Sequence, residues 1–380
     1  MSSKKMFFYS NISRNDKSIG ITKKVFSQIE VFEQKGYDVC YTSYVKNGIE
    51  IIENNKVVFS KTTCIPSRIF RFLRRYYLLY YVNMYLKKNN NFDMAYLRYH
   101  YFDSLMCKIF KRLKKHNAVI VVEAHGWPTK GKISLKTAMP YFLDMIYEKK
   151  CGKYIDYVAA ISSEENIWGC TTLHMDNGIN CNDINPQVKK KDNKYDITLI
   201  SVSNEYAYHG YPKIIRSLYE YKKNGGEKRI RIIFVGEFLK STEKLVKDLC
   251  LQDYIFFVGK KYGDELDEIY NYADIGIGAL ASRAGVSHGS SIKTKEYFAK
   301  GLPFITAWKE YTIPEGYPYV LYFDPFAEIV DMKLIIDFYD KIKDDKAVLT
   351  NMRNFAIKNY TWNKQLGNVI SIIENNEAKL

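Results

Sequence analysis

The sequence lacks the cysteine patterns of disulfide-rich and zinc-binding proteins. Its seven cysteines are scattered along the chain and include no CxxC pair. An odd and unpatterned set of this kind is typical of reduced thiols in a cytosolic protein. We therefore expect neither a disulfide framework nor a zinc site.

Membrane-targeting segments are also lacking. The opening residues, MSSKKMFFYS, run into a predicted strand and contain no apolar stretch of the signal-peptide type. The most apolar window, Tyr76–Leu86, is far shorter than the roughly 20 residues that span a bilayer. The expected location is therefore the cytoplasm.

Common nucleotide-binding and metal-binding motifs are missing as well. No GxGxxG sequence follows a predicted first strand, which disfavours a nicotinamide or flavin enzyme. No Walker loop is present, and no DxD motif stands at a strand end. We expect no bound cofactor and no divalent metal.

Positive charge is concentrated in the first half of the chain. Residues 1–190 hold 30 Lys and Arg against 16 Asp and Glu, whereas the remaining residues hold 27 against 26. Such an excess indicates an anionic partner, either a membrane surface or a nucleic acid.

Both halves of the chain alternate predicted strands and helices. A chain of 380 residues exceeds one ordinary core and fits two domains. Strands such as Ala118–Ala124 and Ile197–Val202 are predominantly apolar, as in parallel sheets covered on both faces. A hairpin is predicted from Ile49–Glu53 and Lys56–Ser60. We predict an α/β protein of two Rossmann-like domains, with a ligand held in a cleft between them at the carboxyl ends of the strands.

The expected domains are residues 1–180 and 196–360. The polar stretch 181–195 shows no periodicity and is predicted to link them. A C-terminal helix over 361–380 is expected to pack back on the first domain.

The segment Gly285–Pro303, GVSHGSSIKTKEYFAKGLP, is the most informative part of the sequence. A loop of small residues leads into a helix beginning near Ser291, and helix N-termini bind phosphate through free amides and a partial positive charge. Lys293 lies in the first turn, and Glu296 follows at i,i+3. This suits a diphosphate beside two ribose hydroxyls. An ordinary capped surface helix has the same pattern, so both interpretations stay open.

The same segment resembles the donor-binding motif of the GT-B glycosyltransferases of family 4, in the branch of capsule, O-antigen and exopolysaccharide synthesis. That motif is S-[SP]-x-K-x-x-E-Y-x-A-x-G-x-P. The matching residues are Ser290, Ser291, Lys293, Glu296, Tyr297, Ala299, Gly301 and Pro303. Further elements resemble the same family, namely Tyr208-His209-Gly210-Tyr211, Asn177-Gly178-Ile179, Leu97-Arg98-Tyr99 and Trp362.

The resemblance implies a retaining, metal-independent transfer of a sugar from a nucleotide diphosphate sugar, with UDP the expected nucleotide. The acceptor would be a glycan or a lipid-linked glycan in surface polysaccharide synthesis. The second domain would bind the donor, and the first would face the acceptor. Lys293 and the amides of residues 290–292 would stabilise the leaving diphosphate. Glu296 would hold the ribose, and Gly285, His288 and Gly289 would contact the donor sugar. His209 is a further candidate for donor binding.

Two departures from the family pattern leave other functions open. His288 stands where the general E-x7-E motif has its first glutamate, and Asn204 and His209 stand where an arginine and a lysine are usual. Lys293 must therefore do more of the phosphate binding. A catalytically silent sugar-nucleotide-binding subunit, a GT-B epimerase and an inverting transferase are the alternatives.

Three residues after a buried strand of the first domain are candidates for the substrate site. His125 is a candidate catalytic residue, because it matches a family position that contacts the donor sugar and could bind a sugar hydroxyl or help to position the acceptor. A buried histidine satisfied by backbone groups is the structural alternative. Glu123 is a candidate acceptor-side base or a structural carboxylate, and Trp127 is a further acceptor-side candidate. Gly20 matches the loop-to-helix entry that lies near the donor phosphates in relatives, but it also suits an ordinary helix start.

The predicted helix Ser67–Lys88 alternates arginine with aromatic and aliphatic residues. Arg68, Arg71 and Arg75 fall at helical spacing, and a second basic cluster, Lys108–Lys115, follows. Such a helix can lie on an anionic membrane, which would make the protein peripheral on the inner face of the plasma membrane. A solvated basic helix face is the plain alternative. No nucleic-acid-binding motif accompanies the charge, and we do not expect nucleic acid as the partner.

Overall fold

The computed structural model describes residues 4–15, 20–65, 67–125, 135–162, 164–282 and 289–377. The chain divides into two compact units. Unit 1 comprises Met1–Asp176 and Gln365–Leu380, and unit 2 comprises Asn177–Lys364. Each unit has its own sheet and is described by itself, and the cleft expected between the two domains stays a prediction.

The described part of unit 1 contains one sheet in the order β4-β3-β2-β1-β5-β6-β7-β9-β8. All neighbours from β2 to β9 pair in parallel, as the apolar strands predicted. The strands are β1 (Lys4–Tyr9), β2 (Tyr37–Val45), β3 (Gly48–Glu53), β4 (Lys56–Thr62), β5 (Met94–Arg98), β6 (Val119–Ala124), β7 (Tyr157–Ala160), β8 (Asn166–Ile167) and β9 (Cys170–His174).

The predicted hairpin is confirmed as β3 and β4, which pair antiparallel. Asn54 and Asn55 join them with φ of 50° and 60°. Both values lie in the left-handed region, which asparagine tolerates better than most residues and which matches the twist of a tight hairpin.

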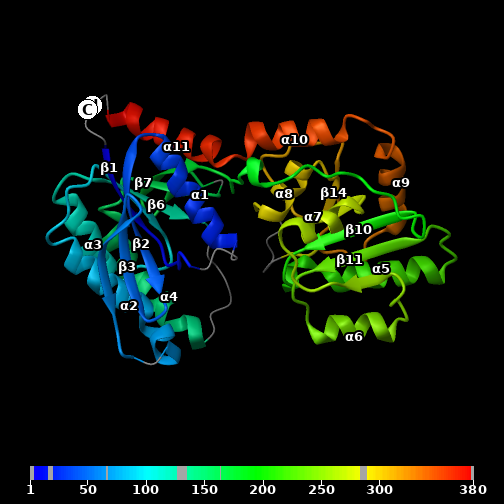
Figure 1. The fold of residues 1–380 in the computed structure, drawn as a ribbon, viewed down its shortest axis with the longest axis horizontal. Coiled ribbons are helices and arrows are strands. Elements are labelled where there is room, and N and C mark those ends of the chain that lie inside the picture. The colour runs from blue at the N-terminus through cyan, green and yellow to red at the C-terminus, as the bar shows by residue number, and fades with distance from the viewer. Residues whose placement is uncertain are drawn as a thin grey trace. The chain divides into compact units, whose positions relative to one another are not determined.

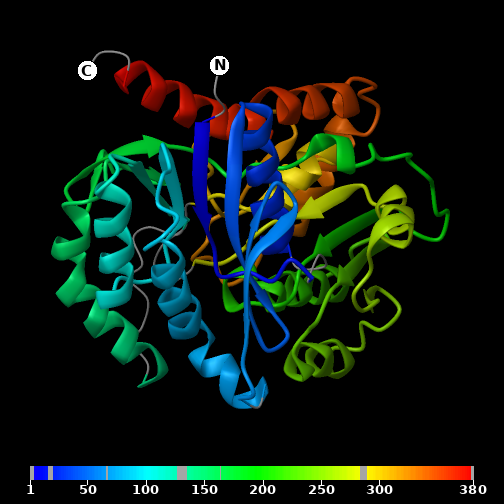
Figure 2. The same cartoon turned by 60° about the vertical axis from the view of Figure 1, so that its left-hand side comes forward.

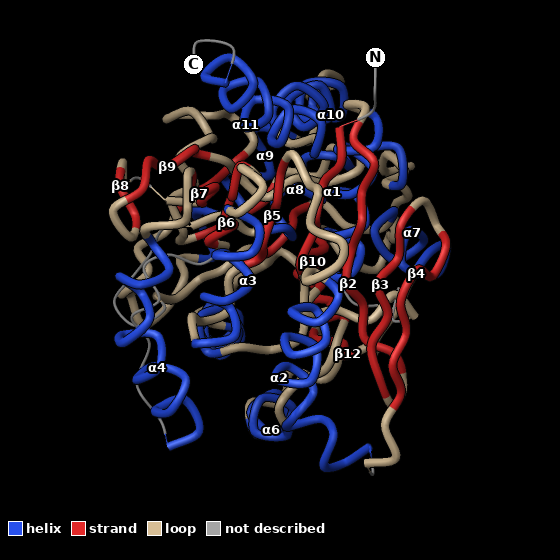
Figure 3. Tube along the Cα trace, turned by 90° about the vertical axis from the view of Figure 1, so that its left-hand side faces the viewer, coloured by secondary structure: helices blue, strands red, loops and turns tan. Residues whose placement is uncertain are grey.

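Helices cover both faces of the unit 1 sheet. They are α1 (Gly20–Gln34), α2 (Ser67–Tyr85), α3 (Ser104–Lys114), α4 (Leu135–Gly152) and the part of α11 (Trp362–Glu377) that begins at Gln365. Figures 2 and 3 show α2, α3 and α4 as a row along one face. Leu79 of α2 and Ile109 of α3 belong to one fully buried cluster with Leu97 and Ile120 of the sheet.

The sheet of unit 2 has the order β12-β11-β10-β13-β14-β15 in its described part, and all neighbours are parallel. Counted within the unit this is 3-2-1-4-5-6, the Rossmann order. The order reverses at β10, so the carboxyl ends of β10 and β13 form the switch point at which ligands bind in such sheets. The strands are β10 (Ile197–Val202), β11 (Ile230–Val235), β12 (Ile255–Phe257), β13 (Ile275–Ile277), β14 (Phe304–Thr306) and β15 (Val320–Tyr322).

The helices of unit 2 also lie on both faces of its sheet. Figure 1 shows α5 and α6 on one side and α8 and α10 on the other. The elements are α5 (Tyr211–Lys223), α6 (Lys240–Asp248), α7 (Gly263–Asn271), α8 (Ile292–Lys300), α9 (Met332–Ile342), α10 (Val348–Asn359) and the short 3-10 helices η1 (Cys181–Asp183) and η2 (Ala207–His209). In the stretch predicted as a linker, buried Gln187 donates from Nε2 to the carbonyls of Tyr270 and Ala273, both at 2.6 Å. This stretch therefore packs on unit 2.

Candidate functional site

Lys293 lies at the switch point of the unit 2 sheet. It stands in the first turn of α8, and its side chain is buried. Its Nζ donates to Ser201 Oγ at the end of β10, at 3.3 Å, and to the carbonyl of Gly278 just after β13, at 3.2 Å. Both partners are neutral, and Lys293 forms no ion pair with another residue in the described part of the chain. The ammonium is therefore held without a compensating charge.

Burial lowers the pKa of Lys293 to about 7, because a charged ammonium loses its hydration there. An anion that reached this group would supply the missing countercharge. The helix N-terminus supports such an anion through the amides at the start of α8, which have no intrahelical partner. Ser291 precedes the helix in an extended conformation and makes no capping hydrogen bond with its side chain.

A chain of hydroxyl groups continues from Lys293 to His209. Ser201 Oγ lies 2.7 Å from the Tyr211 hydroxyl, which also contacts Ser203 Oγ. Ser203 Oγ lies 3.5 Å from His209 Nδ1. The backbone N–H of Tyr206 donates to the same Nδ1 at 3.3 Å, so this nitrogen carries no proton. The hydroxyls can therefore donate from Ser201 through Tyr211 to Ser203, whereas the Nδ1 lone pair of His209 is engaged by the Tyr206 amide.

His209 itself is buried and neutral. Burial and the nearby charge of Lys293 lower its pKa to about 3. Where the family has a lysine, this chain has an uncharged imidazole that accepts hydrogen bonds. Asn204, at the position of the usual arginine, is exposed and accepts from the amide of Glu237 at 3.0 Å. Lys293 is therefore the cation that the described residues place at this switch point.

Several residues of the sequence motif position α8 within unit 2. The Tyr297 hydroxyl donates to the carbonyls of Ile200 and Ile277, which ties the helix to β10 and β13. Gly301 ends the helix with φ of 73°, and a Cβ there would lie 2.6 Å from Leu349 Cα. Thus the motif fixes the helix as well as supplying Lys293.

Two motif elements that are far apart in the sequence meet beside this helix. Asn177 Nδ2 donates to the carbonyl of Ser290 at 3.1 Å, and the Asn177 amide donates to Ser290 Oγ at 3.3 Å. Gly178 lies against Trp362, where a Cβ would be 2.4 Å from the indole ring. The glycine is therefore required by the tryptophan, and the asparagine orients the loop before α8.

Glu296 lies one turn after Lys293 on α8 and is half-buried. Gly289 stands directly before Ser290, and a Cβ on it would lie 3.0 Å from the ring of Trp308. The other two donor-loop candidates, Gly285 and His288, lie outside the described residues. The structure thus brings Lys293, Glu296, Ser290, Ser291 and His209 into one region of unit 2.

Sequence reasoning missed a buried ion pair and an aromatic cluster near this region. Lys295 Nζ pairs with Glu310, and both side chains are buried. Tyr208 lies between Tyr206, with ring centroids 5.7 Å apart, and Trp308, at 5.3 Å. The pair joins residues 15 apart, and the cluster joins η2 to a loop after β14, so neither has a local sequence signal.

A different buried network lies at the strand ends of unit 1. Glu123 at the end of β6 pairs with Lys24 of α1 at 2.8 Å and with Arg98 of β5 at 3.5 Å. It also accepts from Gln28 Nε2 at 3.1 Å and from the Tyr96 hydroxyl at 3.3 Å. Burial alone would raise the pKa of Glu123, but the charges of Arg98 and Lys24 outweigh it and hold the pKa far below the usual range. These contacts favour Glu123 as a structural carboxylate over Glu123 as an acceptor-side base.

His125 follows directly after β6, and part of the residue is accessible to solvent although its ring is largely enclosed. Loss of hydration, and then the charge of Arg98, lower its pKa to about 4, so the ring is neutral at pH 7. Gly20 begins α1, and nothing lies within 4 Å of a Cβ built on it. Trp127 lies outside the described residues. Among the residues that are described, no group of His, Cys, Asp and Glu could hold a metal ion.

Comparison with known proteins gives a clear result for the fold. No protein-family model and no curated protein sequence matches the chain. Solved structures match over almost the whole length. A glycosyltransferase from Rickettsia africae ESF-5 is 14% identical, with 99% of each chain covered and a TM-score of 0.63. The chain has the GT-B fold.

Two further GT-B structures extend the likeness. The catalytic domain of starch synthase IV from Arabidopsis thaliana, bound to ADP and acarbose, is 12% identical and has a TM-score of 0.64, with 99% of this chain and 98% of that chain covered. The trehalose-6-phosphate synthase OtsA is 11% identical and has a TM-score of 0.61, with 98% and 99% covered. At these identities the likeness concerns the fold, and the chemistry must be argued from the residues.

Proposed function

We propose that this GT-B protein is a retaining glycosyltransferase that uses a nucleotide diphosphate sugar, with UDP as the nucleotide. The observation that carries the proposal is the buried, uncompensated Lys293 at the switch point of a Rossmann sheet. A site that keeps an ammonium without a carboxylate is prepared for an anion, and the N-terminus of α8 adds amides to the same place. A diphosphate fits both groups.

In this proposal Lys293 and the first amides of α8 stabilise the charge that develops on the leaving diphosphate. The bond between the anomeric carbon and the phosphate oxygen breaks, and an acceptor hydroxyl forms the new bond on the same face of the sugar. The hydroxyl proton leaves with the diphosphate. Because Lys293 supplies the positive charge, no divalent metal takes part.

The remaining candidates take binding roles. We assign the ribose hydroxyls to Glu296 and a sugar hydroxyl to His125, whose neutral ring can donate or accept a hydrogen bond. Gly20, Gly285, His288 and Gly289 belong to the proposed donor site, with Trp127 on the acceptor side. The acceptor class is a glycan or a lipid-linked glycan in surface polysaccharide synthesis, and the location is cytoplasmic.

The first experiment asks whether the protein binds and turns over such a donor. A panel of nucleotide sugars is screened by thermal shift, since a ligand of the folded state raises its melting temperature. Release of nucleotide without acceptor is then measured for the donor that binds. Lys293→Ala should lower turnover by about 10- to 150-fold, the loss expected for a charge-assisted contact worth about 1.5–3 kcal/mol.

The matched control is Lys244→Ala, which removes an exposed lysine of α6 in the same unit. It should keep wild-type turnover. Binding without any release of nucleotide would favour the silent subunit, and interconversion of donor epimers would favour the epimerase. EDTA should leave turnover unchanged, and restoration by Mg²⁺ or Mn²⁺ after a loss would contradict the proposed mechanism.

A further inference from the structure

Helix α4 of unit 1 carries an apolar face that is open to solvent. Tyr141, Phe142, Met145 and Ile146 are all exposed, with Phe142 at 62% and Met145 at 60%. They form two adjacent pairs, and the second pair follows the first by four residues, about one helical turn. All four side chains therefore lie on one side of the helix. A cluster of large apolar side chains on one surface is unusual for a soluble monomer and indicates an interaction site.

Helix α2 has a second exposed apolar face. Ile69, Leu73, Tyr80 and Met84 follow one another at intervals of four, seven and four residues, which also places them on one side. Helix α3 packs against both α2 and α4, so the three helices form one surface of unit 1 (Figure 3). We call it the α2–α4 surface.

No helix in the described part of the chain is long and apolar enough to cross a membrane.

Positive charge lies between the two apolar faces. Lys108, Lys111 and Lys115, on and directly after α3, are exposed, and α4 ends with exposed Lys149 and Lys150. The sequences of α2 and α3 contain no aspartate or glutamate. The acidic residues of α4 are Asp144 and Glu148, both of them half-buried. The surface is therefore apolar and basic at once.

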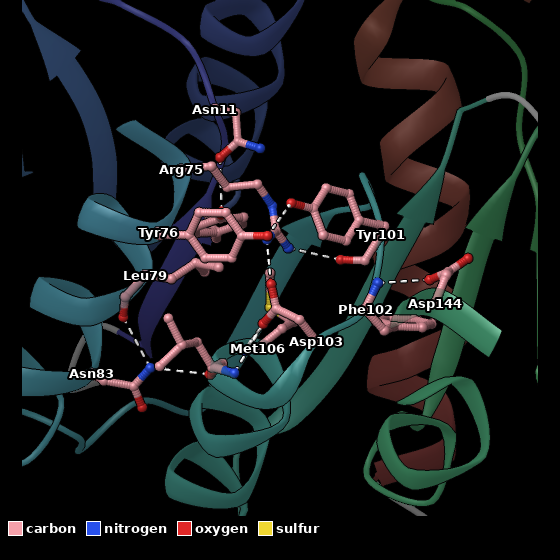
Figure 4. Close-up of polar contacts among 12 residues, drawn as sticks. Asn11, Arg75, Tyr76, Leu79, Asn83, Tyr101, Phe102, Asp103, Met106 and Asp144 are labelled. Atoms are coloured by element: carbon pink, nitrogen blue, oxygen red, sulfur yellow. Dashed lines mark hydrogen bonds and ion pairs between the residues drawn. The ribbon is translucent and has the colours of Figure 1, made fainter. Parts of the chain in front are cut away.

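The helices are held in place by buried polar contacts that face inward. Arg75 of α2 pairs with Asp103 and donates to the carbonyl of Tyr101 at 2.8 Å (Figure 4). Asp144 of α4 accepts from the amide of Phe102 at 2.6 Å. Arg75 was expected among the basic surface residues of this helix, and that prediction is wrong: its side chain is buried, because Asp103 draws its guanidinium into unit 1. Arg74 is exposed and lies 5.0 Å from the ring of Tyr44.

We propose that the α2–α4 surface docks unit 1 onto an anionic membrane, with the apolar side chains of α4 and α2 among the lipids and the lysines of α3 at the headgroups. Amphipathic helices with basic and large apolar residues bind membrane interfaces in this way. A two-fold dimer through the same surface would bring like-charged lysines together. A nucleic acid would use the lysines but leave the apolar residues in water.

The test is flotation of the full chain with vesicles, at low and high salt. Vesicles that contain phosphatidylglycerol should bind the protein at low salt and release it at high salt, because headgroup attraction is screened within about 8–10 Å. Vesicles of phosphatidylcholine alone should bind it weakly. The triple variant Lys108→Glu, Lys111→Glu, Lys115→Glu should lower binding by about 100-fold or more, since each basic residue near the surface contributes roughly 1 kcal/mol.

A second variant tests the apolar part, and two controls match the changes. Phe142→Ser with Met145→Ser should also abolish flotation. Lys240→Glu, Lys244→Glu, Lys247→Glu on α6, and Leu334→Ser with Ile357→Ser in unit 2, alter exposed residues outside the α2–α4 surface and should leave binding unchanged. Absence of binding to anionic vesicles at low salt would overturn the proposal. A concentration-dependent dimer that Phe142→Ser dissociates, without vesicle binding, would assign the surface to a second copy instead.

Discussion

Each unit buries a charged side chain near the carboxyl ends of its strands, but the partners of the two side chains differ. In unit 1, Glu123 is surrounded by Lys24, Arg98 and two neutral donors. In unit 2, the hydrogen-bond partners of Lys293 among the described residues are a hydroxyl and a carbonyl. The first arrangement gives the buried carboxylate two cationic partners, so that its removal would leave both cations without it. The second leaves one charge uncompensated, which costs stability and suits the binding of an anion.

The largest effect that tests this comparison is expected from Glu123→Ala. The change leaves Lys24 and Arg98 buried without their countercharge, and breaking a buried pair in this way costs about 3–5 kcal/mol. Chemical denaturation of the full chain measures it. Glu268→Ala removes an exposed carboxylate that pairs with Lys190 at 2.7 Å, and its effect on the free energy of unfolding should be much smaller because water screens this pair. Equal losses would mean that the buried network has no special role.

For Lys293 we expect the opposite effect, namely that its replacement raises the free energy of unfolding instead of lowering it. Its pKa falls from 10.5 to about 7 on folding, so between these two values the unfolded chain binds more protons than the folded chain. The free energy of unfolding contributed by this group therefore rises with pH across that window. Below pH 7 the full penalty is present, and Lys293→Met should be more stable than the wild type by a few kcal/mol.

The measurement is the free energy of unfolding at several pH values between 6 and 10 for both proteins. The difference between them should shrink as the pH rises. If a donor binds, its KM in the wild type should increase above pH 7, because the charged ammonium is the form that holds the diphosphate. A constant difference in stability would show that Lys293 is already compensated in the folded state.

The smallest effect concerns the hydroxyl chain behind Lys293. Tyr211→Phe keeps the ring but removes the hydroxyl between Ser201 and Ser203. We expect the donor KM to increase about 2- to 10-fold, the range for one lost hydrogen bond, with kcat less affected. Tyr319→Phe serves as the control, because its hydroxyl donates to Asp345 at 2.8 Å elsewhere in unit 2. If both variants changed the donor KM equally, the hydroxyl chain would contribute to stability and have no specific role in donor binding.

The sequence predicted most of the fold because the relevant signals are local. Apolar runs indicated the parallel strands, and the short gap between Ile49–Glu53 and Lys56–Ser60 indicated the hairpin. The two-residue strand β8, Asn166–Ile167, escaped because so short a segment has no period of its own. Lys293 and Glu296 could be singled out because a helix N-terminus has a recognisable sequence.

Other parts of the site depend on contacts between distant segments. Nothing near Arg75 indicates that Asp103 will draw it inward, and nothing near Lys295 indicates Glu310. The hydroxyl chain likewise joins β10, η2, α5 and α8, which only the folded sheet brings together. Sequence patterns identified the residue types, whereas tertiary packing decided which charges are compensated.

The division of the chain also determines which unit is completed first during synthesis. Unit 2 lies within the sequence of unit 1, whose final segment begins at Gln365. In that segment Glu374 accepts from Lys4 and from the Tyr37 hydroxyl, each at 3.1 Å, and Gln365 accepts from the Asp176 amide at 2.7 Å. A ribosome makes the chain from its N-terminus, so unit 2 is complete while unit 1 still lacks these contacts. The half of the molecule that is translated first is therefore the last to be finished.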